Sequence, residues 1–184
     1  PEMLMTGGML AAPDSLAIQD SQLHFHFGNN WMANKGGNTA YQLDYAKREG
    51  GKVIIVEPWL NQTAQAVADE WVPIVPGTDT AFCIGMAYHM IENNLQDQAF
   101  LDKYCVGFDA EHMPEGADPK DNFKDYVLGT YDKEPKTPEW AEAICGVPAA
   151  DIRRLAEEIA GTEKVNFFAG QSTTKIPAGE MFAQ

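Results

Sequence analysis

Four stretches of the chain have the residue pattern that is typical of β-strands. Residues 22–27 (QLHFHF) alternate apolar and polar side chains, and residues 52–57 (KVIIVE) contain a run of β-branched residues. Two shorter candidates are residues 70–75 and 165–169. The first, second and last of these runs pass directly into polar or turn-forming residues, which predicts strands with abrupt carboxyl ends.

Apolar residues at helical spacing fall mainly between these strands. The strongest pattern covers residues 78–93, where Thr78 is an N-cap candidate and an apolar stripe runs from Ala81 to Ile91. The other predicted helices are residues 38–49, 62–69, 97–104, 138–144 and 149–160. Residues 107–131 are polar and contain Gly and Pro, and we predict a loop there.

The order of these elements predicts an α/β fold. About 30 residues separate the starts of the first two strands, the length of a βαβ unit, whose crossover is right-handed and whose strands are parallel. We therefore predict a three-layer α/β/α domain with a mainly parallel, Rossmann-like sheet. This domain is expected to cover residues 20–184. Residues 1–19 lack a clear period and are expected to be a segment left from a preceding domain.

Polar residues follow the predicted strands, at the positions where parallel α/β sheets bind ligands. Gly28-Asn29-Asn30 combines a glycine that admits a ligand to the backbone with two amides that donate and accept hydrogen bonds. Glu57 ends the next strand and Asp79 ends a Pro-Gly-Thr turn, and both can accept hydrogen bonds from the hydroxyl and amine groups of a nucleoside. The structural alternatives are an Asn-rich turn, a solvated acid and a first-turn helix residue, and the pattern leaves them open.

The composition excludes some classes of partner. The chain has 184 residues and a formal net charge of −14, so it would repel a nucleic-acid backbone. No apolar run approaches the roughly 20 residues that span a bilayer, and we predict no direct membrane insertion. Cys83, Cys105 and Cys145 form no CxxC pair, so their spacing predicts neither an iron–sulfur cluster nor a zinc ribbon.

The histidines give no clear metal site in the sequence. His24 and His26 lie two apart on one face of the first predicted strand, which favours a packed or hydrogen-bonded pair over a shared metal ion. Neither His89 nor His112 has a neighbour that suggests a site. The sequence also lacks a nucleophile elbow and therefore gives no support to nucleophilic catalysis.

A series of short motifs in a fixed order resembles the molybdopterin oxidoreductase family. The series begins with Gly28-Asn29-Asn30 and residues 52–58 (KVIIVEP), and it continues through residues 63–64 (TA), 68–71 (ADEW) and 76–79 (PGTD). Further matches at residues 90–95, 97–104, 106–109, 126–129 and 136–141 resemble the catalytic subunit of anaerobic dimethyl sulfoxide reductases in particular. The resemblance extends from about residue 20 to the C-terminus and rests on the ordered series.

The resemblance implies a bis(molybdopterin guanine dinucleotide) molybdenum cofactor. In the family, the glycine and asparagine after the first strand lie near the phosphates, the acid after the next strand meets the guanosine, and the aspartate of the Pro-Gly-Thr-Asp turn meets the guanine. Carried over to this sequence, the cofactor-binding residues are Gly28, Asn29, Asn30, Glu57, Pro58, Trp59, Thr63, Pro76, Gly77, Asp79, Gly170, Gln171 and Lys175. No catalytic residue and no metal ligand is expected among them.

Two positions depart from the family pattern. The family has aspartate followed by Pro-Arg where this chain has Glu57-Pro58-Trp59, and Thr174-Lys175 replaces the family's Gln-Arg. The longer acid and the missing arginine change the contact with the ribose. A lysine keeps the positive charge without the bidentate guanidinium fork.

The resemblance also implies parts that lie outside this chain. An iron–sulfur cluster and the protein ligand of molybdenum are expected upstream, and a domain that closes over the cofactor is expected downstream. The expected partners are the rest of the same polypeptide, an iron–sulfur electron-transfer subunit and a membrane anchor subunit. The whole enzyme is expected in the periplasm or on the outer face of the cytoplasmic membrane. By itself, the chain is not expected to transfer oxygen atoms from dimethyl sulfoxide or similar S- and N-oxides.

Two alternatives are compatible with the sequence. One is another member of the family, such as a formate dehydrogenase or a selenate or related oxyanion reductase, and the molybdenum ligand would identify it. The other is a stand-alone nucleotide-binding module without redox chemistry, which a free-standing reading frame would favour.

Overall fold

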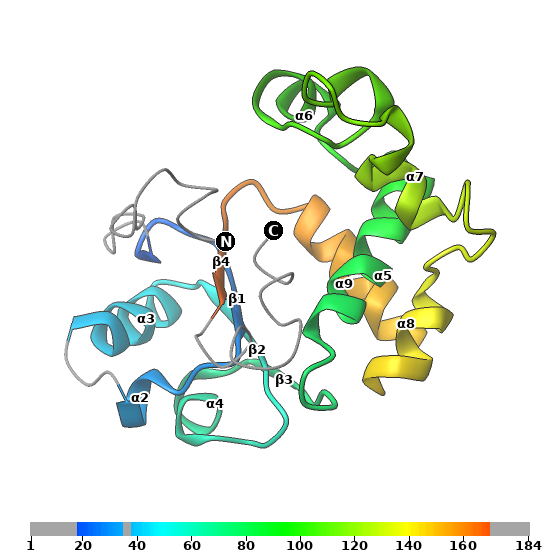
Figure 1. The fold of residues 1–184 in the computed structure, drawn as a ribbon. Coiled ribbons are helices and arrows are strands. Elements are labelled where there is room, and N and C mark those ends of the chain that lie inside the picture. Colours follow the sequence, from blue (N-terminus) through cyan, green and yellow to red (C-terminus); the bar gives the residue numbers. More distant parts are fainter. Residues whose placement is uncertain (1–17, 35–37, 170–184) are drawn as a thin grey trace. The chain divides into compact units, whose positions relative to one another are not determined.

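The computed structural model describes residues 18–34 and 38–169, and the chain divides into two compact units (Figure 1). The sheet unit comprises the residues up to Thr80 together with those from Thr162 onward, and the helical unit comprises Ala81–Gly161. Each unit is described by itself below. In the described part of the chain, no helix combines the length and apolar character that crossing a bilayer requires.

The sheet unit is built on four parallel strands in the order β3-β2-β1-β4. The strands are β1 (Leu23–Phe27), β2 (Lys52–Val56), β3 (Glu70–Val72) and β4 (Val165–Ala169). In the register, Phe27 lies between Val56 of β2 and Ala169 of β4, so three strands end level with one another. The predicted parallel α/β sheet is confirmed, although β3 ends three residues earlier than expected.

Three helices cover one face of this sheet: α2 (Trp31–Asn34), α3 (Asn38–Arg48) and α4 (Gln62–Val67). Leu43 of α3 and Val67 of α4 pack with Val53 and Ile55 of β2 in one hydrophobic cluster. The side chains that point to the opposite face are also buried, among them Phe25, Ile54 and Val56. Burial on both faces explains why β2 is continuously apolar rather than alternating. A second helical layer over the opposite face stays a prediction.

His24 and His26 of β1 are packed in the core of the sheet unit. Both are fully buried, and the His26 ring lies 4.7 Å from the ring of Trp31 and 5.7 Å from that of Phe168. A side chain at Gly51 would approach the backbone oxygen of Ala46 at 2.9 Å, and His24 lies almost as close. Burial lowers the pKa of His26 to about 3 and also lowers the pKa of His24, so both rings stay neutral. The packed interpretation of this pair therefore holds.

The helical unit contains α5 (Asp79–Glu92, from Ala81 on), α6 (Gln98–Tyr104), α7 (Phe123–Leu128), α8 (Pro138–Cys145) and α9 (Ala149–Ala160), with short 3₁₀ turns η2 (Ala110–His112) and η3 (Pro119–Asp121). Helix α5 approaches α8 closely, because a Cβ at Gly85 would lie 2.5 Å from the Cβ of Ala141. Helix α9 buries Ile152, Leu155 and Ala156, as its amphipathic pattern predicts.

The prediction of a loop over residues 107–131 was wrong, because this segment contains η2, η3 and α7. The Asn122 side chain accepts a hydrogen bond from the backbone N–H of Asp125 at 2.9 Å and caps the start of α7. Gly129 ends the helix in the left-handed conformation, with φ of 69°. These caps stabilise a helix of only six residues, too short for a clear periodic signal. The short helix α2 was missed for the same reason.

Candidate functional site

Gly28 and Glu57 follow directly on β1 and β2, at the carboxyl ends of these strands. Because the strands are parallel and in register, both residues leave the sheet at the same edge. The backbone N–H of Gly28 donates to the carbonyl of Val56 at 3.3 Å, which joins the two strand ends. Gly28 has φ of +58°, a conformation that glycine adopts without strain, and the chain can turn sharply here.

Asn29 and Asn30 have different roles in the structure. The Asn30 side-chain oxygen accepts hydrogen bonds from both the backbone N–H and the hydroxyl of Thr63, at 3.2 and 2.9 Å. Its amide nitrogen donates to Gln62, so Asn30 is occupied within the chain. The Asn29 amide nitrogen lies 3.3 Å from Nδ1 of His26, but its buried oxygen has no partner among the described residues. Asn29 therefore keeps a free acceptor.

Thr63 fixes the loop after β1 to the first turn of α4. Its hydroxyl oxygen also accepts a hydrogen bond from the backbone N–H of Met32 at 3.0 Å, and its side chain is fully buried. Asn61 caps α4 through Ala64 and donates to the backbone oxygen of Asn29 at 3.0 Å. Thr63 thus positions the strand-end loop, a role that its place in a sequence motif does not reveal.

Glu57 is a buried acid whose backbone is held on both sides. Its N–H donates to the carbonyl of Val72 at 3.2 Å, and its carbonyl accepts from the indole N–H of Trp71 at 2.9 Å. The side chain is only 8% exposed. Burial and, to a smaller extent, the charge of Asp79 together raise the pKa of Glu57 to about 7. The backbone N–H of Asn29 donates to the carboxylate and acts in the opposite direction.

Asp79 is the first residue of α5 and is buried to the same degree as Glu57. Burial raises its pKa above the usual range. Among the described residues, no lysine or arginine forms an ion pair with either acid. Thr78, the predicted N-cap, donates its hydroxyl to the carbonyl of Val75 at 2.7 Å and so closes the turn before the helix.

The remaining predicted site residues surround these acids in the sequence. Pro58 and Trp59 follow Glu57 and are exposed, with 68% of the Trp59 surface accessible. Pro76 and Gly77 precede Asp79 and are exposed as well, and Gly77 has φ of +81°. Gly170, Gln171 and Lys175 lie outside the described residues.

The described side chains at this edge offer mainly hydrogen-bond acceptors to a ligand. Two buried carboxyl groups and the free oxygen of Asn29 offer hydrogen-bond acceptors. A buried carboxylate without a cation is unfavourable unless donors reach it. The edge therefore fits a ligand that brings several N–H and O–H groups and no strong negative charge to Glu57 and Asp79.

Comparison with known proteins shows the family of the chain. The family model of molybdopterin oxidoreductases matches residues 8–183 of the chain. The chain belongs to the molybdopterin oxidoreductase family. It is 41% identical to dimethyl sulfoxide reductase DmsA of Haemophilus influenzae over 183 residues, which is 97% of this chain and 23% of that protein. It is 35% identical to a trimethylamine-N-oxide reductase of the same organism over 71% of this chain and 14% of that protein.

The fold also has a relative among solved structures. Acetylene hydratase from Pelobacter acetylenicus superimposes with a TM-score of 0.60 over 87% of this chain and 21% of that protein, at 22% sequence identity. This likeness supports the α/β fold. The chain thus corresponds to under a quarter of the length of the reductases that it matches.

Proposed function

We propose that this chain binds the guanosine and phosphate end of a bis(molybdopterin guanine dinucleotide) molybdenum cofactor in a reductase of S- or N-oxides. Family membership implies a molybdenum–pterin cofactor. The observation that supports the guanosine assignment is the pair of buried acids at the sheet edge, which have no ion-pair partner in the described part of the chain. Guanine carries adjacent N–H donors and the ribose carries hydroxyl groups, and both satisfy carboxylates without adding negative charge.

Each acid has its own proposed partner. Glu57 accepts hydrogen bonds from the ribose hydroxyl groups, as the acid after the second strand does in doubly wound folds. Asp79 accepts the N–H groups of the guanine edge, since two donors suit one carboxylate. Gly28 and Asn29 lie toward the phosphates and pterin, where a glycine backbone permits a close approach.

The remaining predicted cofactor-binding residues have secondary roles around Glu57 and Asp79. Asn30 and Thr63 hold the loop through hydrogen bonds to each other, so we assign them a positioning role. Pro58, Trp59, Pro76 and Gly77 are exposed around the acids, and Gly170, Gln171 and Lys175 are proposed contacts after β4. When bound, the cofactor supplies the molybdenum redox chemistry, and this chain supplies position and electrostatics.

The proposed substrates and partners follow from the relatives. DmsA is named for dimethyl sulfoxide reduction and the second relative for trimethylamine N-oxide reduction, so the proposed substrate class is S- and N-oxides. Because the chain spans 23% of DmsA, we propose that it works with the rest of a longer polypeptide. An iron–sulfur cluster upstream, an iron–sulfur electron-transfer subunit, a membrane anchor subunit and a periplasmic or outer-face location complete the proposal.

Titration of the 184-residue chain with GDP and with ADP, followed by amide NMR, tests the guanosine assignment. GDP is expected to shift the amides around Glu57 and Asp79 at lower concentration than ADP, because adenine does not present the same pair of donors to a carboxylate. Equal responses to the two nucleotides, or shifts that avoid the strand ends, would contradict the proposal.

Three variants sharpen this experiment. Asp79→Asn replaces an acceptor with an amide and is expected to remove the preference for GDP. Glu57→Gln is expected to weaken both nucleotides, because both carry a ribose. Glu49→Gln removes an exposed carboxylate that follows α3 and is expected to change neither titration.

A further inference from the structure

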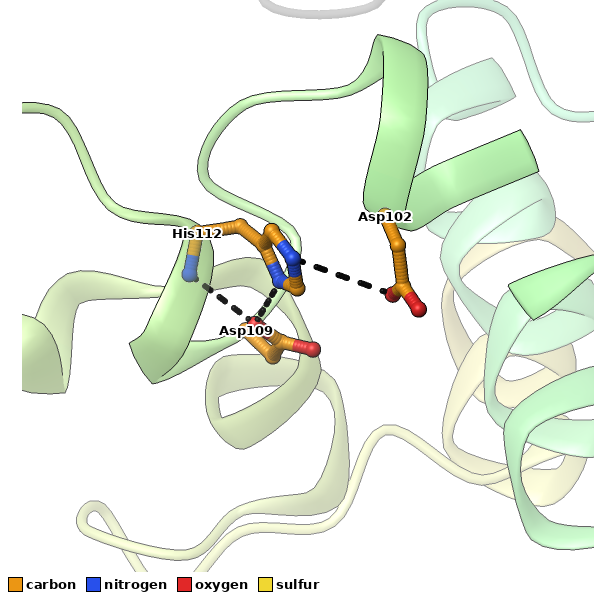
Figure 2. A group of neighbouring side chains, drawn as sticks. All are labelled: Asp102, Asp109 and His112. Carbon is orange, nitrogen blue, oxygen red and sulfur yellow. Dashed lines mark hydrogen bonds and ion pairs between the residues drawn. The ribbon is translucent and has the colours of Figure 1, made fainter. Parts of the chain in front are cut away.

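A second group of titratable side chains lies in the helical unit, between the end of α6 and the turn η2 (Figure 2). It consists of Asp102, Asp109 and His112, each with one potential ligand atom within 4.8 Å of the others. The sequence suggested no neighbours for His112, and the structure corrects that. Asp109 is three residues away on the same turn, whereas Asp102 approaches from the preceding helix.

Asp109 fixes the orientation and the tautomer of the His112 ring. Its Oδ1 accepts the backbone N–H groups of Glu111 and His112 at 3.2 and 3.1 Å, so the carboxylate cannot easily turn away. The same oxygen lies 2.7 Å from Nδ1 of His112. Because an ionised carboxylate only accepts hydrogen bonds, Nδ1 must carry the proton. In a neutral imidazole, Nε2 then has the free lone pair.

That lone pair faces Asp102 across a gap. Nε2 of His112 lies 3.9 Å from Oδ1 of Asp102, which is too long for a hydrogen bond. Two ligand atoms of a tetrahedral zinc ion, each about 2.1 Å from the metal, lie about 3.4 Å apart. The observed gap thus needs to close by only about half an ångström to hold such an ion.

We propose that His112 Nε2 and Asp102 bind a divalent transition-metal ion of the Zn²⁺ type. Asp109 then acts as the outer carboxylate of a carboxylate–histidine–metal arrangement, which is the usual support for a metal-bound imidazole. One nitrogen and one oxygen ligand favour zinc and similar ions over Mg²⁺ and Ca²⁺, which prefer oxygen alone. The side chains of Asp102 and His112 are 47% and 30% exposed, so an ion can enter and water can complete its shell.

The loop that carries His112 is built independently of the ion. The backbone N–H of Gly107 donates to the carbonyl of His112 at 2.8 Å, and Gly107 has φ of +84°. The carbonyls of Gly107 and Phe108 accept from Phe123 and Lys124 at the start of α7. The loop is therefore closed on itself and tied to a helix. Binding consequently requires a movement of the Asp102 side chain, whose Oδ1 also accepts a hydrogen bond from the Gln98 side-chain amide at 2.6 Å and would have to share or release that donor.

Titration of the full 184-residue chain with ZnCl₂ at neutral pH, followed by the imidazole ¹⁵N resonances, tests this proposal. Zinc is expected to shift Nε2 of His112 while Nδ1 keeps its proton, and calorimetry gives the affinity. MgCl₂ and CaCl₂ are expected to leave the resonances unchanged. An absence of any zinc-dependent shift at His112 would overturn the proposal.

Two variants identify the ligands. Asp102→Asn and His112→Gln are each expected to weaken zinc binding by at least about tenfold, the lower end of what a lost supporting contact costs at metal sites. Asp118→Asn is the matched control, because Asp118 caps η3 as Asp109 caps η2 but has no histidine beside it. Unchanged zinc affinity in both ligand variants would place the ion elsewhere and overturn the proposal.

Discussion

The two acids at the edge of the sheet and the paired acids of the helical unit have pKa values that are shifted in opposite directions. Glu57 and Asp79 are buried and have no ion-pair partner among the described residues, and burial raises the pKa of both. In the helical unit, a hydrogen bond from Arg153 lowers the pKa of Glu139, and one from Lys136 lowers that of Asp132. The helical unit thus gains stability from these ionised acids, whereas the sheet unit loses stability when Glu57 and Asp79 ionise. Asp69 of the sheet unit pairs with Lys47 and has a lowered pKa, as the paired acids of the helical unit do.

This difference separates structural acids from candidate ligand-binding acids. A carboxylate that already has a cation has little to gain from a ligand. A buried carboxyl group that lacks one gains most when a ligand brings donors, and the apolar strands around it must supply the stability that it costs. The following predictions test this comparison, from the largest expected effect to the smallest.

Phe25→Ala tests how far the sheet unit depends on its apolar strands. Phe25 is fully buried at the centre of β1, and its truncation is expected to lower the free energy of unfolding by about 3–5 kcal/mol. Urea denaturation measures this loss. Phe167→Ala is the control, because that ring lies 5.7 Å from Phe25 in β4 but is 53% exposed. Equal losses in the two variants would contradict the prediction.

Glu57→Gln tests the unfavourable ionisation of the sheet-edge acid. The pKa of Glu57 rises from 4.5 to about 7 on folding. The contribution of the protonated side chain to the free energy of unfolding is therefore complete below pH 4.5 and is lost as the pH rises through 7. The stability of the variant relative to the wild type is therefore expected to be greater at pH 8 than at pH 4.5, by on the order of 3 kcal/mol. Urea midpoints of the cofactor-free chain at the two pH values measure this. A pH-independent difference would show that Glu57 ionises normally.

The buried histidines lower the stability of the sheet unit at low pH. Burial lowers the pKa of His26 to about 3 and that of His24 in the same direction. Their contribution to the free energy of unfolding is therefore present above the ordinary histidine pKa and is lost as the pH falls below that value. Between about pH 4.5 and 6.5, a rise in pH lowers the stability through Glu57 and increases it through His26, so the two effects oppose each other. The sheet unit is thus expected to be most stable in mildly acidic solution.

The sequence allowed the sheet to be predicted because its strands carry a strong signal. Residues 53–56 are β-branched and buried on both faces, and the predicted strand at 165–169 matches β4. The helices of the segment 107–131 escaped prediction because their stability comes from individual caps, such as Asn122 and Gly129, rather than from a periodic apolar face.

The candidate site was predictable only in part. Its position after the strands follows from the order of the elements, and this placed Gly28, Asn29 and Glu57 correctly at one edge. The different roles of Asn29 and Asn30 depend on which of the two side chains contacts Thr63. Asn30 makes this contact, and the two residues are more than thirty positions apart in the sequence. The gap between His112 and Asp102 likewise depends on how the loop after α6 turns back.

Glu139→Gln tests the opposite side of the comparison and has the smallest expected effect. Glu139 lies in the first turn of α8 and pairs with Arg153 of α9 at 2.5 Å, with 60% of the acid side chain exposed. An exposed pair of this kind contributes less than about 1 kcal/mol. Because Arg153 lowers the pKa of Glu139, this contribution is present above the unfolded-state pKa and is lost as the pH falls through the folded-state value. The variant should therefore be slightly less stable than the wild type at pH 8 and equal to it in acid, as urea midpoints would show. A gain in stability at pH 8, like that expected for Glu57→Gln, would mean that burial and not pairing governs the acids of both units.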